Sequence, residues 1–345
     1  MFKGKMSADR CICDFRVFRL GTTISSIFVV IVFGVNLLLV SKSNFGTPCT
    51  TTLNKTLEEN LKVIQNYPSG DADKYLIVND ANNSKHQIIR QIPVFVTAFD
   101  YTHYRESEGL FKSLHERFLS NQKYRNDMVI IVYDLGLTSS EAKMVQRNCK
   151  CEFRRFPFEY YPPHVRTLRT YSFKPIIVNL LLMEYDFVWW VDTSVRFVTD
   201  GIETAIEQAI LHRILYRVSP DKQTTGTLIK NTMEATFQFL KESICNFKQF
   251  NEVFATSLVF HADRISLAAV QAWVKCALNE GCIAPYGSQL KHRCDFSNDY
   301  EERCHRFDQS VIGIIIRRLF QEQNDNFLQG DLYHVKRGDY VSYFK

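Results

Sequence analysis

The sequence predicts an α/β domain whose mostly parallel sheet is flanked by helices, preceded by one membrane-spanning helix and a stem. Three segments, at 92–99, 128–136 and 186–192, have the near-continuous hydrophobicity of strands buried on both faces. Helical patterns alternate with these strands, which is the order expected for a parallel sheet covered by helices. A separate run at 21–40 has no ionisable side chain and supplies the membrane helix.

Residues 21–40 are long enough to cross a hydrocarbon layer of about 30 Å as a helix. Five basic and two acidic residues lie in 1–20, and only Lys42 follows the run closely. The positive-inside rule therefore places 1–20 in the cytosol, 41–91 as a stem in the lumen, and the domain at 92–345 beyond it. A cleaved signal peptide is the alternative, but its apolar region is shorter, about 7–15 residues.

The cysteines agree with a luminal domain. Cys11 and Cys13 lie in the predicted tail, as palmitoylation candidates or as idle reduced thiols. The remaining eight form an even number, which in an oxidising compartment predicts disulfides, with 276–304 as a locally stapled insert. No CxxC pair occurs, which disfavours zinc. Two luminal sequons, at Asn54 and Asn82, are candidate glycosylation sites.

Composition and missing motifs exclude several classes of protein. The 46% hydrophobic and 13% aromatic content excludes a disordered chain. The net charge of +5 is partly concentrated in the tail, so the rest lacks the basic face that nucleic acid requires. No GxxxxGK(S/T), GxGxxG or GxSxG motif appears, which disfavours P-loop kinases, dinucleotide oxidoreductases and α/β-hydrolases.

The remaining elements follow from the spacing of apolar residues. Pro175 is expected in the first turn of its helix or at a kink. Some helix is also expected near 53–64, within the stem. Further strands are predicted at 151–158 and 253–261, and helices at 106–121, 139–147, 168–184, 202–212, 228–241, 265–279 and 307–320.

Polar residues at the ends of the predicted strands are the candidate binding residues, because ligands of open α/β sheets bind outside the carboxyl ends of the strands. The strand at 186–192 ends in Asp192, with Arg196 close behind. A carboxylate there can hold Mg²⁺ or Mn²⁺ beside a phosphate-bearing substrate, and a guanidinium can form a bidentate contact with the phosphate. The alternative is that Asp192 caps the following loop and pairs with Arg196.

Several ordered motifs carry a resemblance to a known family: IPVFVTAFD, IIVYDLGLT, RRFPFEYYPPHVRTLRTYSFKPIIV, WWVDTSVRF, GCIAPYGS and HRFDQSVIGII. From residue 92 onward the chain resembles a nematode-rich family of uncharacterised type II membrane proteins, similar to nucleotide-diphospho-sugar transferases of the GT-A fold. The resemblance implies a Golgi or ER glycosyltransferase. It would take a nucleotide-sugar donor and a glycan, glycoprotein or glycolipid acceptor.

The same resemblance implies site residues. The end of the first strand, with Thr97 and Phe99, would contact the nucleotide base. The metal-binding Asp-x-Asp position falls on Asp192-Thr193-Ser194, so Ser194 stands where a second acid is expected. Asp192, Ser194 and His334 would hold Mn²⁺ or Mg²⁺ beside the diphosphate. Ser194 leaves metal dependence open.

Charge can also be offset without a metal, and the resemblance suggests Arg196, Arg169 and Lys174 for that purpose. Asp308, in HRFDQS, is the candidate general base on the acceptor side if the enzyme inverts configuration. Its alternative is a helix cap. Two rivals to a transferase remain: a catalytically silent luminal binding or scaffolding protein, and, more weakly, a sulfotransferase.

Overall fold

The computed structural model describes residues 55–75, 87–220, 226–297, 300–321 and 331–345. The predicted tail, membrane helix and both sequon asparagines lie outside the described residues. Within the ranges given, no helix combines the length and the hydrophobicity needed to cross a membrane. The chain divides into two units, and the second, Thr50–Lys345, contains all the elements described below.

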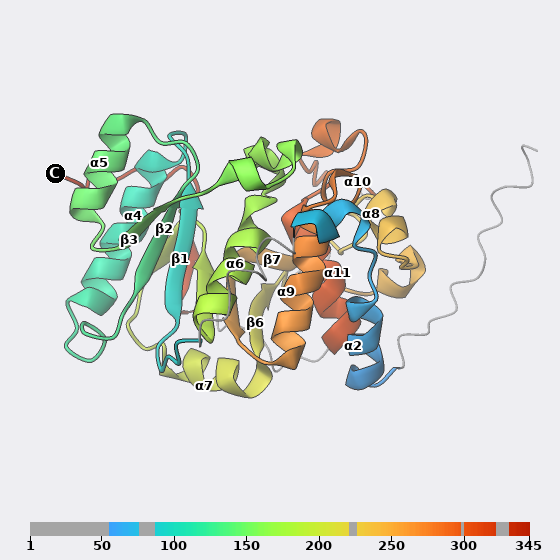
Figure 1. Cartoon of the computed structure of the whole chain (residues 1–345), viewed down its shortest axis with the longest axis horizontal. Coiled ribbons are helices and arrows are strands. Elements are labelled where there is room, and N and C mark those ends of the chain that lie inside the picture. Colours follow the sequence, from blue (N-terminus) through green and yellow to red (C-terminus); the bar gives the residue numbers. More distant parts are fainter. Residues whose placement is uncertain (1–54, 76–86, 221–225, 298–299, 322–330) are drawn as a thin grey trace, which may run out of the picture. The chain divides into compact units, whose positions relative to one another are not determined.

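The centre of this unit is a six-stranded sheet with the order β3-β2-β1-β4-β7-β6 (Figure 1). The first four strands of this order are mutually parallel, and β7 and β6 are antiparallel additions. The predicted α/β class with a mostly parallel sheet is therefore confirmed. The strands are β1 Val94–Phe99, β2 Ile130–Asp134, β3 Glu152–Arg155, β4 Phe187–Val191, β6 Ile214–Val218 and β7 Val253–His261.

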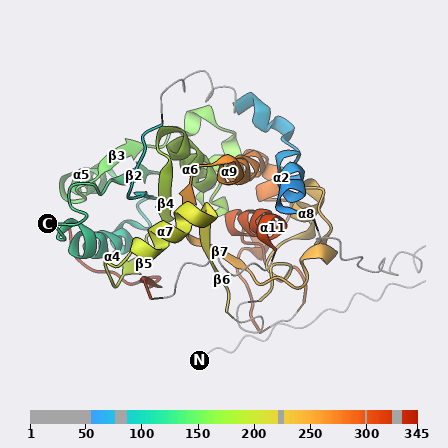
Figure 2. The same ribbon diagram turned by 90° about the horizontal axis from the view of Figure 1, so that it is seen from below.

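Helices cover both faces of the sheet, and each face has its own hydrophobic core. One core joins α2, α6, α9 and α11 to the sheet, and the other joins α4, α5 and α7 (Figures 1 and 2). Side chains alternate between the cores along β4, where Trp189 enters one and Trp190 the other. The helices are α2 Leu57–Gln65, α4 Tyr104–Leu114, α5 Ser139–Asn148, α6 Phe173–Glu184, α7 Glu203–His212, α8 Glu234–Phe239, α9 Arg264–Ala277, α10 Glu280–Ile283 and α11 Asp308–Phe320.

Three strands were not predicted. Strands β5 (Val195–Phe197) and β8 (Tyr333–Val335) form a separate antiparallel pair, and each is too short to show a period. Strand β6 follows α7 after one residue, so its apolar residues continue the helical pattern. Two predicted helices are shorter than expected: 168–184 begins with 3₁₀ turns before α6, which has Pro175 in its first turn, and 228–241 contains only α8.

Part of the predicted stem packs on the domain. Helix α2 begins with a capping box, in which Thr56 and Glu59 satisfy each other's backbone N–H groups. Its residues Leu61 and Ile64 are buried in the core that contains α9 and α11. Just beyond, the buried Tyr67 donates a hydrogen bond to Glu242 Oε1 at 2.6 Å. We therefore assign residues 57–67 a structural part in the globular unit.

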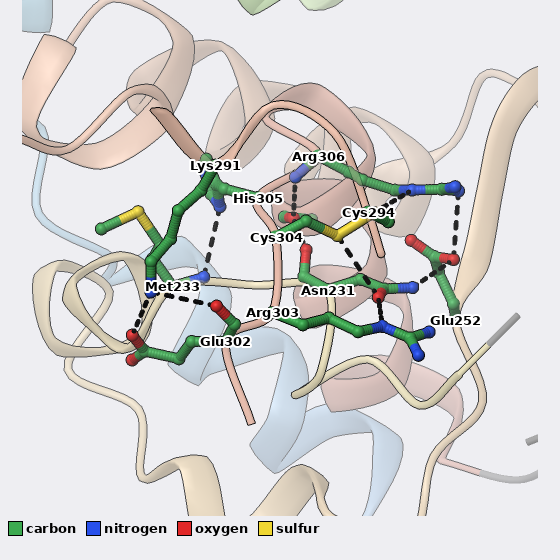
Figure 3. The surroundings of a disulfide bond; sticks show 11 residues. Asn231, Met233, Glu252, Lys291, Cys294, Glu302, Arg303, Cys304, His305 and Arg306 are labelled. Carbon is green, nitrogen blue, oxygen red and sulfur yellow. Dashed lines mark hydrogen bonds and ion pairs between the residues drawn. A yellow bond between two sulfur atoms is a disulfide. The ribbon is translucent and has the colours of Figure 1, made fainter. Parts of the chain in front are cut away.

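The disulfides predicted for the cysteine-rich region are present. Cys276 bonds to Cys282 and Cys294 to Cys304, which staples the insert as expected. Cys149 and Cys151 form a third bond, and Cys245 is disulfide-bonded as well. Figure 3 shows Asn231 beside the Cys294–Cys304 bond. The side-chain oxygen Oδ1 of Asn231 accepts a hydrogen bond from Arg303 Nε at 2.9 Å. The insert is thus fixed by both covalent and polar contacts.

Candidate functional site

A cavity of about 1240 Å³ opens at the carboxyl ends of the parallel strands. Phe99 of β1, Leu135 after β2 and Asp192 after β4 contribute to its wall. The opposite direction of β7 brings its first residues to the same edge, so Ala255 and Thr256 line the cavity too. The site therefore lies where the sheet topology predicts a ligand.

Lys174 of α6 is buried at the centre of this site. Its Nζ lies 3.2 Å from Asp192 Oδ1 and 2.9 Å from Asp308 Oδ2, and it donates to the carbonyl of Ala255 at 3.2 Å. Nζ also lies 5.2 Å from the centroid of the Trp190 ring. Burial opposes the charged form, but the two carboxylates outweigh it and raise the pKa of Lys174. One ammonium group therefore holds two acidic side chains.

Asp308 is the first residue of α11 and is almost completely buried. Burial raises the pKa of its carboxyl to about 6, Lys174 opposes this rise, and Asp192 adds to it. The preceding Phe307 has φ of 46° and ψ of −113°, a strained backbone conformation for a residue with a side chain. Its ring packs on His305 at a centroid distance of 5.0 Å. This packing fixes the main chain that directs Asp308 at the cavity.

Asp192 remains partly accessible, with 27% of its side chain exposed. The indole of Trp190 donates to Asp192 Oδ1 at 2.7 Å, so that oxygen meets both Trp190 and Lys174. The alternative pairing with Arg196 does not occur. Asp192 is thus held from the protein side and open to the cavity.

Arg196 has a structural position instead of the expected phosphate-binding one. Its guanidinium donates to the carbonyls of Thr193, Val195, Glu106 and Asp339, between 2.6 and 3.0 Å. It packs against Gly109, where an added Cβ would lie 2.4 Å from its Cζ. Burial lowers the pKa of the guanidinium. Arg196 does not line the cavity and joins α4, β5 and the C-terminal segment.

The other predicted residues separate into two groups. Phe99, Arg169 and Ser194 line the cavity with Asp192, Lys174 and Asp308. Thr97 is buried in β1 and does not line it, and His334 is exposed on β8, directly opposite Arg196. The predicted metal ligands therefore do not converge. In the described ranges, no three His, Cys, Asp or Glu side chains meet at one point.

These residues do not fit a resident divalent cation. The Lys174 ammonium already neutralises the Asp192 oxygen that it contacts, and a metal ion there would be repelled by it. The predicted second ligand is the short hydroxyl of Ser194, and the third is absent from the cavity. A protein cation therefore already partners the carboxylate that was expected to bind a metal.

Sequence reasoning missed several residues of the cavity wall. Arg293 and His292 come from the stapled insert, and Arg337 and Tyr340 from the segment after β8. The sequence gives no periodicity in either segment, so only the fold brings them beside Asp192. His103 also lines the wall, and its hydrogen bond to Asp100 raises its pKa although burial opposes this.

His305 belongs to the same wall and is completely buried. Nε2 faces the carbonyl of Ile283 at 2.9 Å. Nδ1 faces the N–H of Met233 at 3.3 Å (Figure 3). We assign Nε2 as the donor and Nδ1 as the acceptor, which is the neutral ring. Burial lowers the pKa of His305 from 6.5 to about 4.

This shift predicts a loss of stability in acid. In the unfolded chain His305 takes up a proton near pH 6.5, and in the folded chain only near pH 4. The stability that the folded protein gains from keeping this ring neutral is therefore complete above pH 6.5 and is lost as the pH falls toward 4. The full loss amounts to about 3 kcal/mol. When denaturant unfolding is measured between these pH values, the free energy of unfolding should change less steeply with pH for His305→Gln than for the wild type. Equal slopes would contradict the assignment.

Comparison with known proteins finds one family model that matches part of the chain and several solved structures with a distant likeness to it. The model of a family described as "Protein of unknown function (DUF1647)" matches residues 43–179. No curated protein matches the chain. Among solved structures, the apo form of the bifunctional glycosyltransferase WbbM has 11% identity and a TM-score of 0.40, over 71% of this chain and 39% of that one.

Two further structures match over most of their own length. The galactosyltransferase LgtC, solved with donor and acceptor sugar analogues, has 13% identity and a TM-score of 0.39, covering 71% of this chain and 87% of that one. The mannosyltransferase Ktr4p from S. cerevisiae has 10% identity and a TM-score of 0.40, covering 84% and 82%. The predicted similarity to glycosyltransferases is confirmed only as a distant structural resemblance. At these scores it carries no argument about activity.

Proposed function

We propose that this protein is a membrane-anchored glycosyltransferase that moves a sugar from a nucleotide-diphosphate donor to a glycan, protein or lipid acceptor. The observation that supports it is the pair of carboxylates, Asp192 and Asp308, held by one buried lysine at the ligand-binding edge of the sheet. The cavity of about 1240 Å³ exceeds the usual range for one small ligand, about 300–1,000 Å³, and so has room for donor and acceptor together.

Asp308 is suited to act as the general base. With a pKa of about 6 it is mostly ionised at neutral pH, yet it binds a proton more readily than an ordinary aspartate. The acceptor oxygen would attack the anomeric carbon, and the bond from that carbon to the diphosphate oxygen would break. The nucleoside diphosphate leaves with the bonding electrons, and the acceptor proton passes to Asp308. This path inverts the configuration of the sugar.

The proposed location is the lumen of the Golgi or ER, with residues 21–40 as the anchor. The disulfides support it, because such bonds persist in oxidising compartments and are rare in the cytosol. The segment between the anchor and α2 would hold the domain away from the membrane.

Nucleotide binding tests the proposal. Full-length protein in detergent should bind at least one of UDP, GDP and CDP, measured by calorimetry. Asp192→Ala should weaken this binding about tenfold or more, because the carboxylate would accept a hydrogen bond from a ribose hydroxyl of the nucleotide. Asp331→Ala, at an exposed position outside the cavity, serves as the control. Absence of binding to all three nucleotides, with and without Mn²⁺, would contradict the proposal.

A catalytically silent binding protein is the second candidate. It is favoured by Ser194 at the expected second acidic position and by Lys174, which partners both carboxylates. Donor hydrolysis or transfer by the purified protein separates the two functions. Turnover that Asp192→Ala abolishes would exclude the silent reading.

A further inference from the structure

We infer that Arg169, Arg293 and Arg337 bind the diphosphate of the nucleotide, so that nucleotide binding needs no divalent cation. This inference rests on the proposed function, which supplies the nucleoside diphosphate as ligand. The three arginines would balance the charge of the diphosphate, in place of the Mn²⁺ or Mg²⁺ that the family resemblance implies.

Asp192 already has two protein partners on one of its carboxylate oxygens. Its Oδ1 contacts the Lys174 ammonium at 3.2 Å and accepts from the Trp190 indole at 2.7 Å, so this oxygen already has a protein cation as its counter-ion. Lys174 is itself fixed by Asp308 and by a backbone carbonyl. If the ammonium moved away to admit a second cation at Asp192, the buried Asp308 carboxylate would lose its counter-ion.

The three arginines have side chains that are open to a ligand in the cavity. All three line the cavity and are exposed, and within the described part of the chain none has a hydrogen bond or ion pair with another residue. Arg306 on the same wall provides the contrast, because it pairs with the buried Glu252 at 3.2 Å. A guanidinium presents a planar pair of donors that matches a phosphate group. Three such groups are therefore available to an anion in the cavity.

The three arginines reach the wall of one cavity from separate segments of the fold. Arg169 lies in the 3₁₀ turn Leu168–Thr170 before α6, and Arg337 follows β8. Arg337 opposes the rise in pKa that burial causes in Tyr171, which places its charge close to that ring. Arg293 precedes Cys294, whose disulfide to Cys304 fixes that part of the insert. The three positive charges thus lie on walls around Asp192 and Asp308.

Equilibrium binding of UDP, GDP and CDP to the full-length protein tests the inference. Affinity should agree within about twofold between EDTA and Mn²⁺. Each of Arg169→Gln, Arg293→Gln and Arg337→Gln should weaken binding about tenfold, as expected for a charged hydrogen bond. Arg125→Gln changes an exposed arginine outside the cavity and should leave binding unchanged. Thermal melting confirms that the surface variants fold.

The outcomes separate the inference from the proposed function. Binding that requires Mn²⁺ and disappears in EDTA would overturn the inference and retain the transferase proposal. Metal-independent binding that none of the three arginine variants weakens would also overturn it. Absence of nucleotide binding under both conditions would instead contradict the proposed function. Equal affinity in EDTA and Mn²⁺ with losses confined to the cavity arginines supports both.

Discussion

Replacing Asp308 by asparagine is expected to lower kcat by about 10²–10⁴-fold, the range usual for loss of a general base. Asparagine keeps the shape of the side chain but cannot accept the acceptor proton. Nucleotide affinity should change only a few-fold, because the proposed function assigns Asp308 to the acceptor and not to the nucleotide. In the wild type, kcat/KM should rise with pH through about 6, since only ionised Asp308 is active and its pKa is raised to about 6. Initial rates of sugar transfer measure both effects.

The control for this prediction must separate catalysis from folding. Asp308→Asn leaves the buried Lys174 with one carboxylate, so near-ultraviolet circular dichroism and nucleotide binding must confirm an intact site. Asp331→Asn changes an exposed acid outside the cavity and should leave kcat unchanged. An unaltered kcat for Asp308→Asn would rule out Asp308 as the base. So would residual activity of this variant in which kcat/KM still rises with pH through about 6.

The second large effect is expected for Glu242→Gln, which should lower the free energy of unfolding by about 3–5 kcal/mol. Glu242 and Arg318 are both buried, Arg318 Nε donates to Glu242 Oε1 at 2.7 Å, and Nη2 contacts Oε2. Loss of the negative charge leaves the guanidinium buried without a counter-ion. The hydroxyl of Tyr67 loses a charged acceptor as well. Denaturant unfolding at neutral pH measures the change.

Two comparisons sharpen this result. The triple variant Tyr67→Phe/Glu242→Met/Arg318→Met removes all three polar groups and should lose less stability than Glu242→Gln alone, because no buried charge is left unpaired. Glu301 pairs with Lys248 at 3.1 Å on the surface, and Glu301→Gln should cost less than about 1 kcal/mol. Equal losses for Glu242→Gln and Glu301→Gln would refute the buried-pair argument.

The centre of the site could be predicted because it follows from short-range patterns. A strand of five buried residues ends at Asp192, and the parallel topology fixes the edge at which that end lies. Asp308 was placed at the start of a helix, where the structure has it. Lys174 was expected beside a phosphate, and the structure adds that its partners are the two aspartates.

The rest of the site depends on contacts between distant segments. Arg196 was expected at the phosphate, but the short strand β5 carries its side chain to α4 and the C-terminal segment. His334 lies opposite Arg196 on the paired strand β8 and is exposed to solvent, so it too is away from the cavity. Arg293 and Arg337 reach the cavity only through a stapled insert and β8, neither of which has a hydrophobic period to indicate its position. Local pattern cannot specify such loop positions.

The ammonium shared by Asp192 and Asp308 also couples the two acids energetically. Removal of one leaves Lys174 bound more tightly to the other, so the remaining carboxylate is more fully neutralised than before. The losses caused by the single changes are therefore non-additive, and the double variant differs from their sum. The effect of a substitution at either position consequently depends on the residue at the other, although they lie 116 positions apart in the chain.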